Sequence, residues 1–153
     1  MLLEPVRWEK ENFAVSTDPK MLDVESIHAF LSRSYWAEGI PLSVVRKSVQ
    51  NSLGFGLYLS DEGRFRQIGF ARVVSDYATF AYLGDVYVLE EYRGKGLSKW
   101  LMDCVVAHPQ LQGLRRFCLG TKDAHGLYMR YGFEVIKAPE NWMEIKKPNL
   151  YKR

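Results

Sequence analysis

Apolar residues recur at helical spacing in several parts of the chain. The longest such pattern places apolar residues three or four positions apart, as one buried helix face requires, at Leu97, Trp100, Leu101, Cys104 and Val105. A second amphipathic segment, residues 22–33, follows the turn signal Thr17-Asp18-Pro19, and Pro41 opens a third over residues 42–50. We predict helices over these three segments and a shorter fourth one through Tyr128.

Other segments are short apolar runs or alternate apolar and polar residues, which is typical of strands. Ser60-Asp61-Glu62-Gly63 separates two of these runs and predicts a hairpin. A helix lies between the last run before residue 90 and the run at 116–120, so those two strands are expected to be parallel. The predicted strands are Phe13–Ser16, Leu53–Leu59, Gln67–Val74, Phe80–Leu89, Arg116–Gly120 and Phe133–Ile136, with Trp142–Ile145 as a further edge strand. This order of elements predicts an α+β fold.

Length and composition indicate one ordinary globular domain over residues 1–153. The chain is 47% hydrophobic and 25% charged, and its net charge of +3 is too small for a dedicated nucleic-acid binder. No apolar stretch approaches the about 20 residues of a membrane span, and charged residues occupy the place of a signal peptide's apolar core. We therefore expect a cytoplasmic protein without nucleic-acid or membrane partners. Cys104 and Cys118 are expected to be buried free thiols.

Residues 93–98, Arg-Gly-Lys-Gly-Leu-Ser, lie between an apolar, β-branched run and the long helix. Gly94 and Gly96 let the backbone approach a ligand closely, and the helix start offers unpaired N–H groups and the positive end of a dipole. Positive side chains surround the turn at Arg93, Lys95 and Lys99. The segment predicts a site for an anionic phosphate group, such as a pyrophosphate. The alternative is a basic turn that only starts a helix. Neither P-loop spacing nor the three-glycine dinucleotide fingerprint occurs.

A second motif, A-x-x-L-Y-x-x-x-G-F, follows about thirty residues later, at Ala124, Leu127, Tyr128, Gly132 and Phe133. Together the two segments resemble the GNAT acetyltransferase superfamily. Its acetyl-CoA signature has Arg or Gln, then a glycine three residues on, then Gly or Ala two further on. Arg93, Gly96 and Ser98 stand at these positions. The resemblance extends from about residue 67 to 136.

Two residues depart from the family's pattern. Ser98 replaces the usual Gly or Ala, and since serine is small and suits a first helical turn, we expect a slightly altered cradle for the pyrophosphate. Thr121 stands where relatives often have asparagine, seven residues before the tyrosine. We therefore expect one side-chain contact to the pantetheine arm to differ from that of the family.

The resemblance implies a single-domain GNAT-like fold, a mixed and mostly antiparallel sheet of about six to seven strands with about four helices on its two faces. It implies acetyl-CoA as co-substrate and no metal. The central strand should splay from its parallel neighbour, so that the pantetheine arm bonds along the opened edge. Gly84 fits such a distortion, or is simply tolerated there. The implied cofactor-binding residues are Val86 and Val88 through their backbone, with Arg93, Gly94, Lys95, Gly96, Leu97, Ser98, Lys99 and Thr121.

The implied reaction moves an acetyl group to a primary amine by direct attack on the thioester. Tyr128 matches the family tyrosine near the thioester sulfur, and its hydroxyl, protonated at neutral pH, could protonate the leaving thiolate. The alternative is that Tyr128 is a helix residue packed in the core. An amine is protonated at pH 7, so the site also needs a base. Asp85 is our candidate, because burial in its apolar run would favour proton uptake. It could equally be a structural carboxylate. We leave His125 out of the mechanism.

The acceptor site is expected near residues 34–39, between the first two helices, where the resembling folds shape the acceptor pocket. The rings of Tyr35 and Trp36, with a carboxylate such as Asp76, could hold a cationic amine, although aromatic residues are more often core residues. The acceptor is expected to be an amine of a small molecule or peptide. A homodimer is one expectation for the assembly. The competing hypothesis is a non-catalytic CoA-binding or protein-interaction module.

Overall fold

The computed structural model describes residues 3–152, and these form a six-stranded sheet in the order β1-β2-β3-β4-β5-β6. Neighbouring strands are antiparallel except β5 and β6, which are parallel as predicted. The strands are β1 (Arg7–Lys10), β2 (Phe13–Ser16), β3 (Leu53–Asp61), β4 (Arg64–Ser75), β5 (Phe80–Val88) and β6 (Arg116–Leu119). The predicted α+β class is therefore confirmed.

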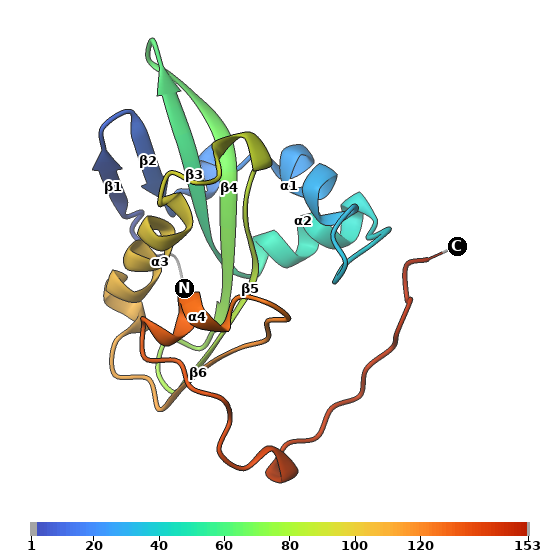
Figure 1. Cartoon of the computed structure of the whole chain (residues 1–153). Helices are drawn as coiled ribbons and strands as arrows, with labels where there is room; N and C mark the ends of the chain where they lie inside the picture. Colours follow the sequence, from blue (N-terminus) through green and yellow to red (C-terminus); the bar gives the residue numbers. More distant parts are fainter. Residues whose placement is uncertain (1–2, 153) are drawn as a thin grey trace.

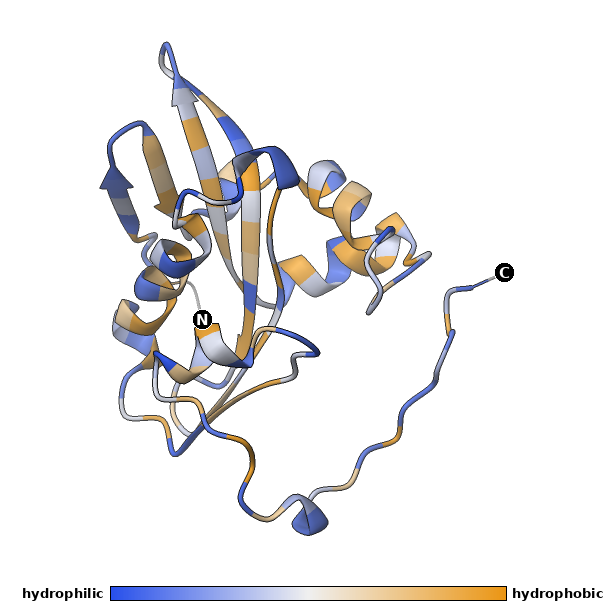
Figure 2. Cartoon of the chain, viewed as in Figure 1, coloured by the Kyte–Doolittle hydropathy of each residue, from blue (hydrophilic) through white to orange (hydrophobic). Residues whose placement is uncertain are grey.

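Helices cover both faces of the sheet (Figure 1). One core cluster joins α3 to the central strands, and the other joins α1 and α2 to Phe70 and Tyr87 on the opposite face. Figure 2 shows apolar residues recurring along the strands and along the helices, alternating with polar ones. Within residues 3–152 the α-helices are α1 (Val24–Leu31), α2 (Leu42–Gln50), α3 (Leu97–Ala107) and α4 (His125–Met129), and the 3-10 turns are Pro19–Met21, Glu90–Tyr92, Pro109–Leu111 and Pro139–Asn141.

Local signals set the helix boundaries. α2 begins after Pro41 and has the predicted bounds. α1 begins later than predicted because Asp23 caps it, accepting a hydrogen bond from the Ser26 N–H at 3.0 Å.

Cys104 is buried in α3 and Cys118 is half-buried in β6, and both are free. Burial, with a contribution from Asp103, raises the pKa of the Cys104 thiol to about 12.

Two strand predictions are wrong, and one strand was not predicted. Residues 133–136 form no strand, because a cavity lies between them and β6. Residues 142–145 form none either, and the Met143 and Ile145 side chains are both 96% exposed. The unpredicted strand is β1, a largely charged edge strand that, within residues 3–152, pairs only with β2 and lacks the alternation of a half-buried strand.

Asp76 closes the turn between β4 and β5. Its Oδ1 accepts hydrogen bonds from the backbone N–H groups of Ala78, Thr79 and Phe80 at 3.0, 2.8 and 3.2 Å, and its Oδ2 accepts one from the Thr79 hydroxyl at 2.7 Å. These hydrogen bonds hold the pKa of the Asp76 carboxyl well below its usual value, and the two from Thr79 have the largest effect. The ionised side chain therefore stabilises the turn.

We expect Asp76→Ala to lower the melting temperature at pH 7, because the four hydrogen bonds are lost. The folded-state pKa of Asp76 lies below its unfolded value, so its contribution is complete above about pH 4 and is lost as the pH falls further. The difference in melting temperature between wild type and variant should therefore shrink below about pH 4. Thermal melts followed by circular dichroism test this. A difference that does not change with pH would show that ionisation of Asp76 is irrelevant.

Candidate active site

A β-bulge interrupts the pairing of β5 with β4. Phe70 pairs with Tyr87 and Arg72 with Gly84, so two residues of β5, Asp85 and Val86, lie opposite a single residue of β4. Asp85 has a left-handed backbone, with φ of +54°. Aspartate adopts this conformation more readily than most residues. The distortion that the sequence suggested at Gly84 is thus present, but the left-handed residue is the next one.

Just before the bulge, β5 loses its parallel neighbour. The pairing of β5 with β6 ends at Leu83 and Leu119, whereas β5 continues to Val88. After Leu119 the chain leaves β6 and forms the loop that leads to α4. The backbone of residues 84–88 is therefore unpaired on the β6 side. It leads through the 3-10 turn Glu90–Tyr92 to residues 93–98, the glycine turn. Such an open edge can hydrogen-bond an extended ligand as a strand would.

Both carboxylate oxygens of Asp85 are held by side chains. Arg72 Nε donates to Oδ2 at 2.7 Å and Trp36 Nε1 donates to Oδ1 at 2.9 Å. Arg72 also donates through Nη1 to the Ser52 hydroxyl at 3.2 Å. The Asp85 side chain is 11% exposed, so water screens this ion pair only weakly. Each carboxylate oxygen accepts more than one hydrogen bond, so Asp85 can still receive a ligand's N–H.

The predicted acceptor residues gather beside this network. Trp36 reaches Asp85 from the loop between α1 and α2, and its ring contacts Tyr35 edge-on, with centroids 5.1 Å apart. Lys122, from the loop before α4, lies over the Tyr35 ring at 5.4 Å. Both aromatic side chains are well exposed, at 62% for Tyr35 and 43% for Trp36. They are therefore surface residues that could meet a ligand.

Asp76 does not join this group. Its carboxylate is bound within its own turn, before β5 begins. Five residues of strand between Phe80 and Asp85 span on the order of 16 Å. Asp76 is accordingly left out of the site assembled here.

The glycine turn has the backbone that its sequence requires. Gly94 and Gly96 have φ of +81° and +74°, a conformation that favours glycine. A Cβ added at either residue would meet no atom within 4 Å, so the space over the turn is open. Lys95 and Lys99 are exposed around it, and the buried Leu97 anchors the start of α3.

The amino end of α3 offers free donors. Gly96 is its N-cap and provides no side-chain cap, so among the described residues the N–H groups of residues 97–99 have no partner. Arg93 Nε donates to the Val88 carbonyl at 2.9 Å, which ties the turn to the end of β5. That carbonyl is thus already engaged by the chain. Free N–H groups, a helix dipole and three nearby cations suit an anionic phosphate group.

Tyr128 lies in α4, and its side chain is only 8% exposed. Burial raises the pKa of the Tyr128 hydroxyl above its usual value of 10.0, and Tyr35 and Asp123 make smaller contributions in the same direction. The hydroxyl therefore stays protonated at neutral pH. It donates to no other side chain or backbone group among the described residues. A protonated and uncommitted hydroxyl can serve as a proton donor.

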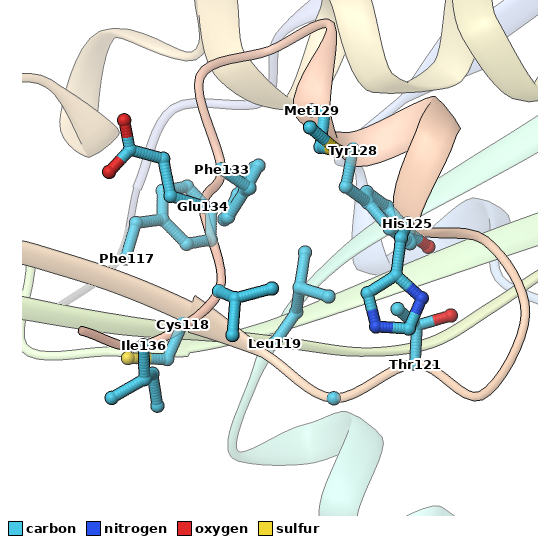
Figure 3. Close-up of a pocket in the computed structure, with 12 residues that line it drawn as sticks. Phe117, Cys118, Leu119, Thr121, His125, Tyr128, Met129, Phe133, Glu134 and Ile136 are labelled. Atoms are coloured by element: carbon cyan, nitrogen blue, oxygen red, sulfur yellow. The ribbon is translucent and has the colours of Figure 1, made fainter. Parts of the chain in front are cut away.

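A cavity of about 320 Å³ adjoins Tyr128 on the outer side of β6 (Figure 3). Thr121 and His125 also line it, and Thr121 Oγ1 accepts a hydrogen bond from the Ala124 N–H at 3.0 Å. His125, which the sequence analysis set aside, thus shares a cavity with Tyr128.

Within residues 3–152, no group of three or more His, Cys, Asp or Glu is arranged to hold a metal, and no helix is long and apolar enough to cross a membrane.

Comparison with known proteins identifies the family. A sequence model of the acetyltransferase (GNAT) domain matches residues 55–135. The Gibberella zeae protein named "Putative acetyltransferase FG08082" is 32% identical over 146 residues, which cover 83% of this chain and 81% of that protein. The chain therefore belongs to the GNAT acetyltransferase family, as its two motifs indicated.

Solved structures agree with this assignment. A crystal structure of a "putative acetyltransferase belonging to the gnat family" from Xanthomonas campestris pv. campestris matches with a TM-score of 0.88 and 54% identity, covering 95% of this chain and all of that one. A predicted acetyltransferase from Clostridium acetobutylicum, solved with acetyl-CoA, has the same fold, with a TM-score of 0.62 at 18% identity, covering 88% of this chain and 95% of that one.

The structure brings together several residues that sequence reasoning named separately. Trp36 contacts Asp85, and Tyr128 shares a cavity with Thr121. Arg72 and its partner Ser52 were not among the predicted site residues. One signal could have found Arg72: an arginine within an alternating strand is rarely buried unless a carboxylate pairs with it.

Proposed function

We propose that the protein transfers an acetyl group from acetyl-CoA to a primary amine of a small molecule or peptide. The observation that carries this proposal is the unpaired edge of β5, which runs from the bulge at Asp85 to the glycine turn. An extended chain with a pyrophosphate at one end and a reactive thioester at the other fits such an edge. Acetyl-CoA is the corresponding co-substrate of the GNAT family.

The glycine turn would hold the pyrophosphate of acetyl-CoA. The unpartnered N–H groups of residues 97–99 would donate to its oxygens, and Lys95 and Lys99 would supply countercharge. Arg93, which is bonded to the Val88 carbonyl, would fix the turn relative to β5. The exposed backbone of residues 84–88 would then bind the pantetheine arm, with Val86 as the central contact and Thr121 at its side.

Tyr128 would protonate the sulfur that leaves. The neutral amine attacks the thioester carbonyl carbon, a C–N bond forms, and the C–S bond breaks as the electron pair moves to sulfur. The Tyr128 hydroxyl gives its proton to the thiolate and regains one from solvent. Burial favours this role, because it keeps the phenol protonated until the thiolate forms.

Asp85 would receive the proton of the attacking amine, directly or through a water molecule. Its bonds to Arg72 and Trp36 fix the carboxylate, and the remaining lone pairs can accept an ammonium N–H. The exposed rings of Tyr35 and Trp36 would flank the amine through cation–π contact. The position of these rings beside Asp85 favours a cationic acceptor that leaves part of its surface in water.

We expect Gly96→Ala to weaken acetyl-CoA binding by roughly tenfold or more, because its Cβ would enter the open space over the turn and displace charge-assisted hydrogen bonds. Gly113→Ala is a matched control. Gly113 has φ of +71°, and its added Cβ also meets open space, but it lies outside the glycine turn. The backbone strain is thus similar in both variants. Calorimetry with acetyl-CoA measures both affinities, and equal affinities in the two variants would refute the proposed pyrophosphate site.

We expect Tyr128→Phe to lower kcat by roughly 100-fold while acetyl-CoA affinity is retained, because only the proton donor is lost. Release of free CoA thiol in a panel of primary amines measures turnover. The control is Tyr82→Phe, which removes the hydroxyl of an exposed tyrosine at the paired end of β5. Wild-type kcat in Tyr128→Phe would show that this tyrosine is structural. Absence of turnover with every amine would favour the non-catalytic module.

The pH dependence gives a separate test of Tyr128. Its pKa is raised above the usual 10.0, so it remains a proton donor up to that pH. Wild-type kcat should therefore fall only above about pH 10, as Tyr128 ionises. This decline should be absent in Tyr128→Phe. The same alkaline decline in both enzymes would assign it to another group.

We expect Asp85→Asn to lower kcat by roughly 100-fold, because an amide cannot take the amine's proton. Asparagine tolerates the left-handed backbone and can still accept a hydrogen bond from Arg72, but the ion pair is lost, so a thermal melt accompanies the assay to show that the variant is folded. Trp36→Phe is the companion variant: it removes the Nε1 donor to Asp85 and shrinks the aromatic ring but keeps the carboxylate, so it should reduce kcat much less. If Asp85→Asn reduces kcat no more than Trp36→Phe does, the carboxylate has only a structural role.

A further inference from the structure

The proposed proton donor lies in the shortest α-helix of residues 3–152. α4 has five residues, fewer than an isolated helix needs to be stable in water. Apart from the buried Tyr128, the apolar residues in and around it pack only partly against the core, at Ala124, Leu127 and Phe133. Apolar packing of this kind is not directional. The orientation of α4 therefore depends on hydrogen bonds to the rest of the fold.

One side chain supplies these hydrogen bonds. The Tyr131 hydroxyl lies 2.6 Å from the Lys99 carbonyl oxygen and 2.7 Å from Oδ1 of Asp103, and it donates its proton to these two acceptors. The chain just after α4 thus lies against α3 (Figure 1). Within residues 3–152, no other hydrogen bond ties residues 121–133 to another part of the chain. Tyr131 is therefore the directional link between this segment and α3.

The two acceptors lie on the same face of α3, because Lys99 and Asp103 are four residues apart. Burial, and then the hydrogen bond to Asp103, raise the pKa of the Tyr131 hydroxyl, so it remains a donor at neutral pH. A hydrogen bond to a carboxylate is stronger than one between neutral groups. The link is thus maintained at neutral pH, although Asp103 itself is exposed.

Short-range contacts connect Tyr131 to Tyr128. The Tyr131 N–H donates to the Tyr128 carbonyl at 2.9 Å, and the Phe133 N–H donates to the same carbonyl at 3.3 Å. Gly132, with φ of +90°, lies in this turn at the end of α4. The Phe133 ring also contacts the Tyr128 ring edge-on, with centroids 6.0 Å apart. A shift of Tyr131 would therefore move Tyr128 with it.

Lys99 lies in the first turn of α3, whose free N–H groups would hold the pyrophosphate. We propose that Tyr131 is a positioning residue that acts through Tyr128, because its hydroxyl fixes the proton donor relative to the pyrophosphate turn. The pyrophosphate and the thioester sulfur belong to one molecule, so the protein must meet both at once. A misplacement on the order of 1 Å can cost about 100-fold in rate. This inference rests on the proposed function, since it requires Tyr128 to meet the sulfur.

We expect Tyr131→Phe to lower kcat by roughly tenfold or more while acetyl-CoA affinity is unchanged. The variant removes the hydroxyl but keeps the ring, and the proposed pyrophosphate site on α3 is untouched. Release of free CoA thiol measures kcat, and calorimetry measures affinity. Tyr92→Phe is the matched control, because it removes a hydroxyl that accepts a hydrogen bond from Arg66 Nη1 at 3.2 Å, away from α4, and it should change neither quantity. Wild-type kcat in Tyr131→Phe would overturn the proposal.

A double-mutant cycle separates positioning of Tyr128 from a general structural role. If Tyr131 acts through Tyr128, Tyr131→Phe should have no further effect on kcat in a protein that already carries Tyr128→Phe. A structural role would lower kcat equally in both backgrounds, so equal losses would overturn the proposal.

Asp103→Asn is the conservative variant, because it keeps an acceptor oxygen for the Tyr131 hydroxyl. We expect it to retain most of the wild-type kcat. A loss as large as that in Tyr131→Phe would overturn the assignment of the effect to this hydrogen bond.

A measurement by NMR needs no turnover and so distinguishes this proposal from the proposed function. The tyrosines are labelled with ¹³C at Cζ, whose chemical shift reports on the hydroxyl, and the Tyr128 signal is the one missing from Tyr128→Phe. We expect this signal to move towards that of free tyrosine in Tyr131→Phe and to remain unchanged in Tyr92→Phe, with thermal melts showing that both variants are folded. An unmoved Tyr128 signal in Tyr131→Phe would overturn the proposal. A moved signal in an enzyme that turns over no amine would support the positioning and refute the proposed function.

Discussion

The early end of pairing between β5 and β6 is the constraint on which the rest of the site depends. Parallel neighbours in a sheet normally share hydrogen bonds along their length, but here the ladder stops at Leu83 and Leu119. The two strands then diverge towards different partners. β5 continues to the glycine turn, where Arg93 is bonded to the Val88 carbonyl, while β6 leads to α4 and Tyr128. The divergence therefore creates the open edge and places the two sequence motifs at its ends.

This open edge is maintained at a cost in stability. Asp85 adopts a left-handed backbone that costs on the order of 1 kcal/mol for a residue other than glycine. Its largely buried ion pair with Arg72 must also offset the desolvation of both charges. Strained residues of this kind persist where the surroundings fix them, and they often occur at functional sites. The hydrogen bond from Trp36 completes this fixation and links the bulge to the loop between α1 and α2.

Most of the fold could be predicted from the sequence, because its signals are local. Hydrophobic periodicity and Pro41 gave the bounds of α2, and the crossing helix gave the parallel pairing of β5 with β6. The glycine turn could be predicted because left-handed backbone favours glycine there. The features that were predicted wrongly, or not at all, depend on tertiary partners. Residues 133–136 have strand-like composition but lie across a cavity from β6, and the partner of Asp85 is an arginine 13 residues away in sequence.

Amide chemical-shift mapping by NMR tests the central claim most directly, because it reports on the β5 edge itself. On addition of acetyl-CoA, the account predicts that the largest shifts occur at Val86 and Val88 and at residues 94–99, with small shifts in β1 to β3. Shifts confined to the outer edge of β6, or no saturable shift along β5, would contradict it. In that case the open edge of β5 would not be the acetyl-CoA site.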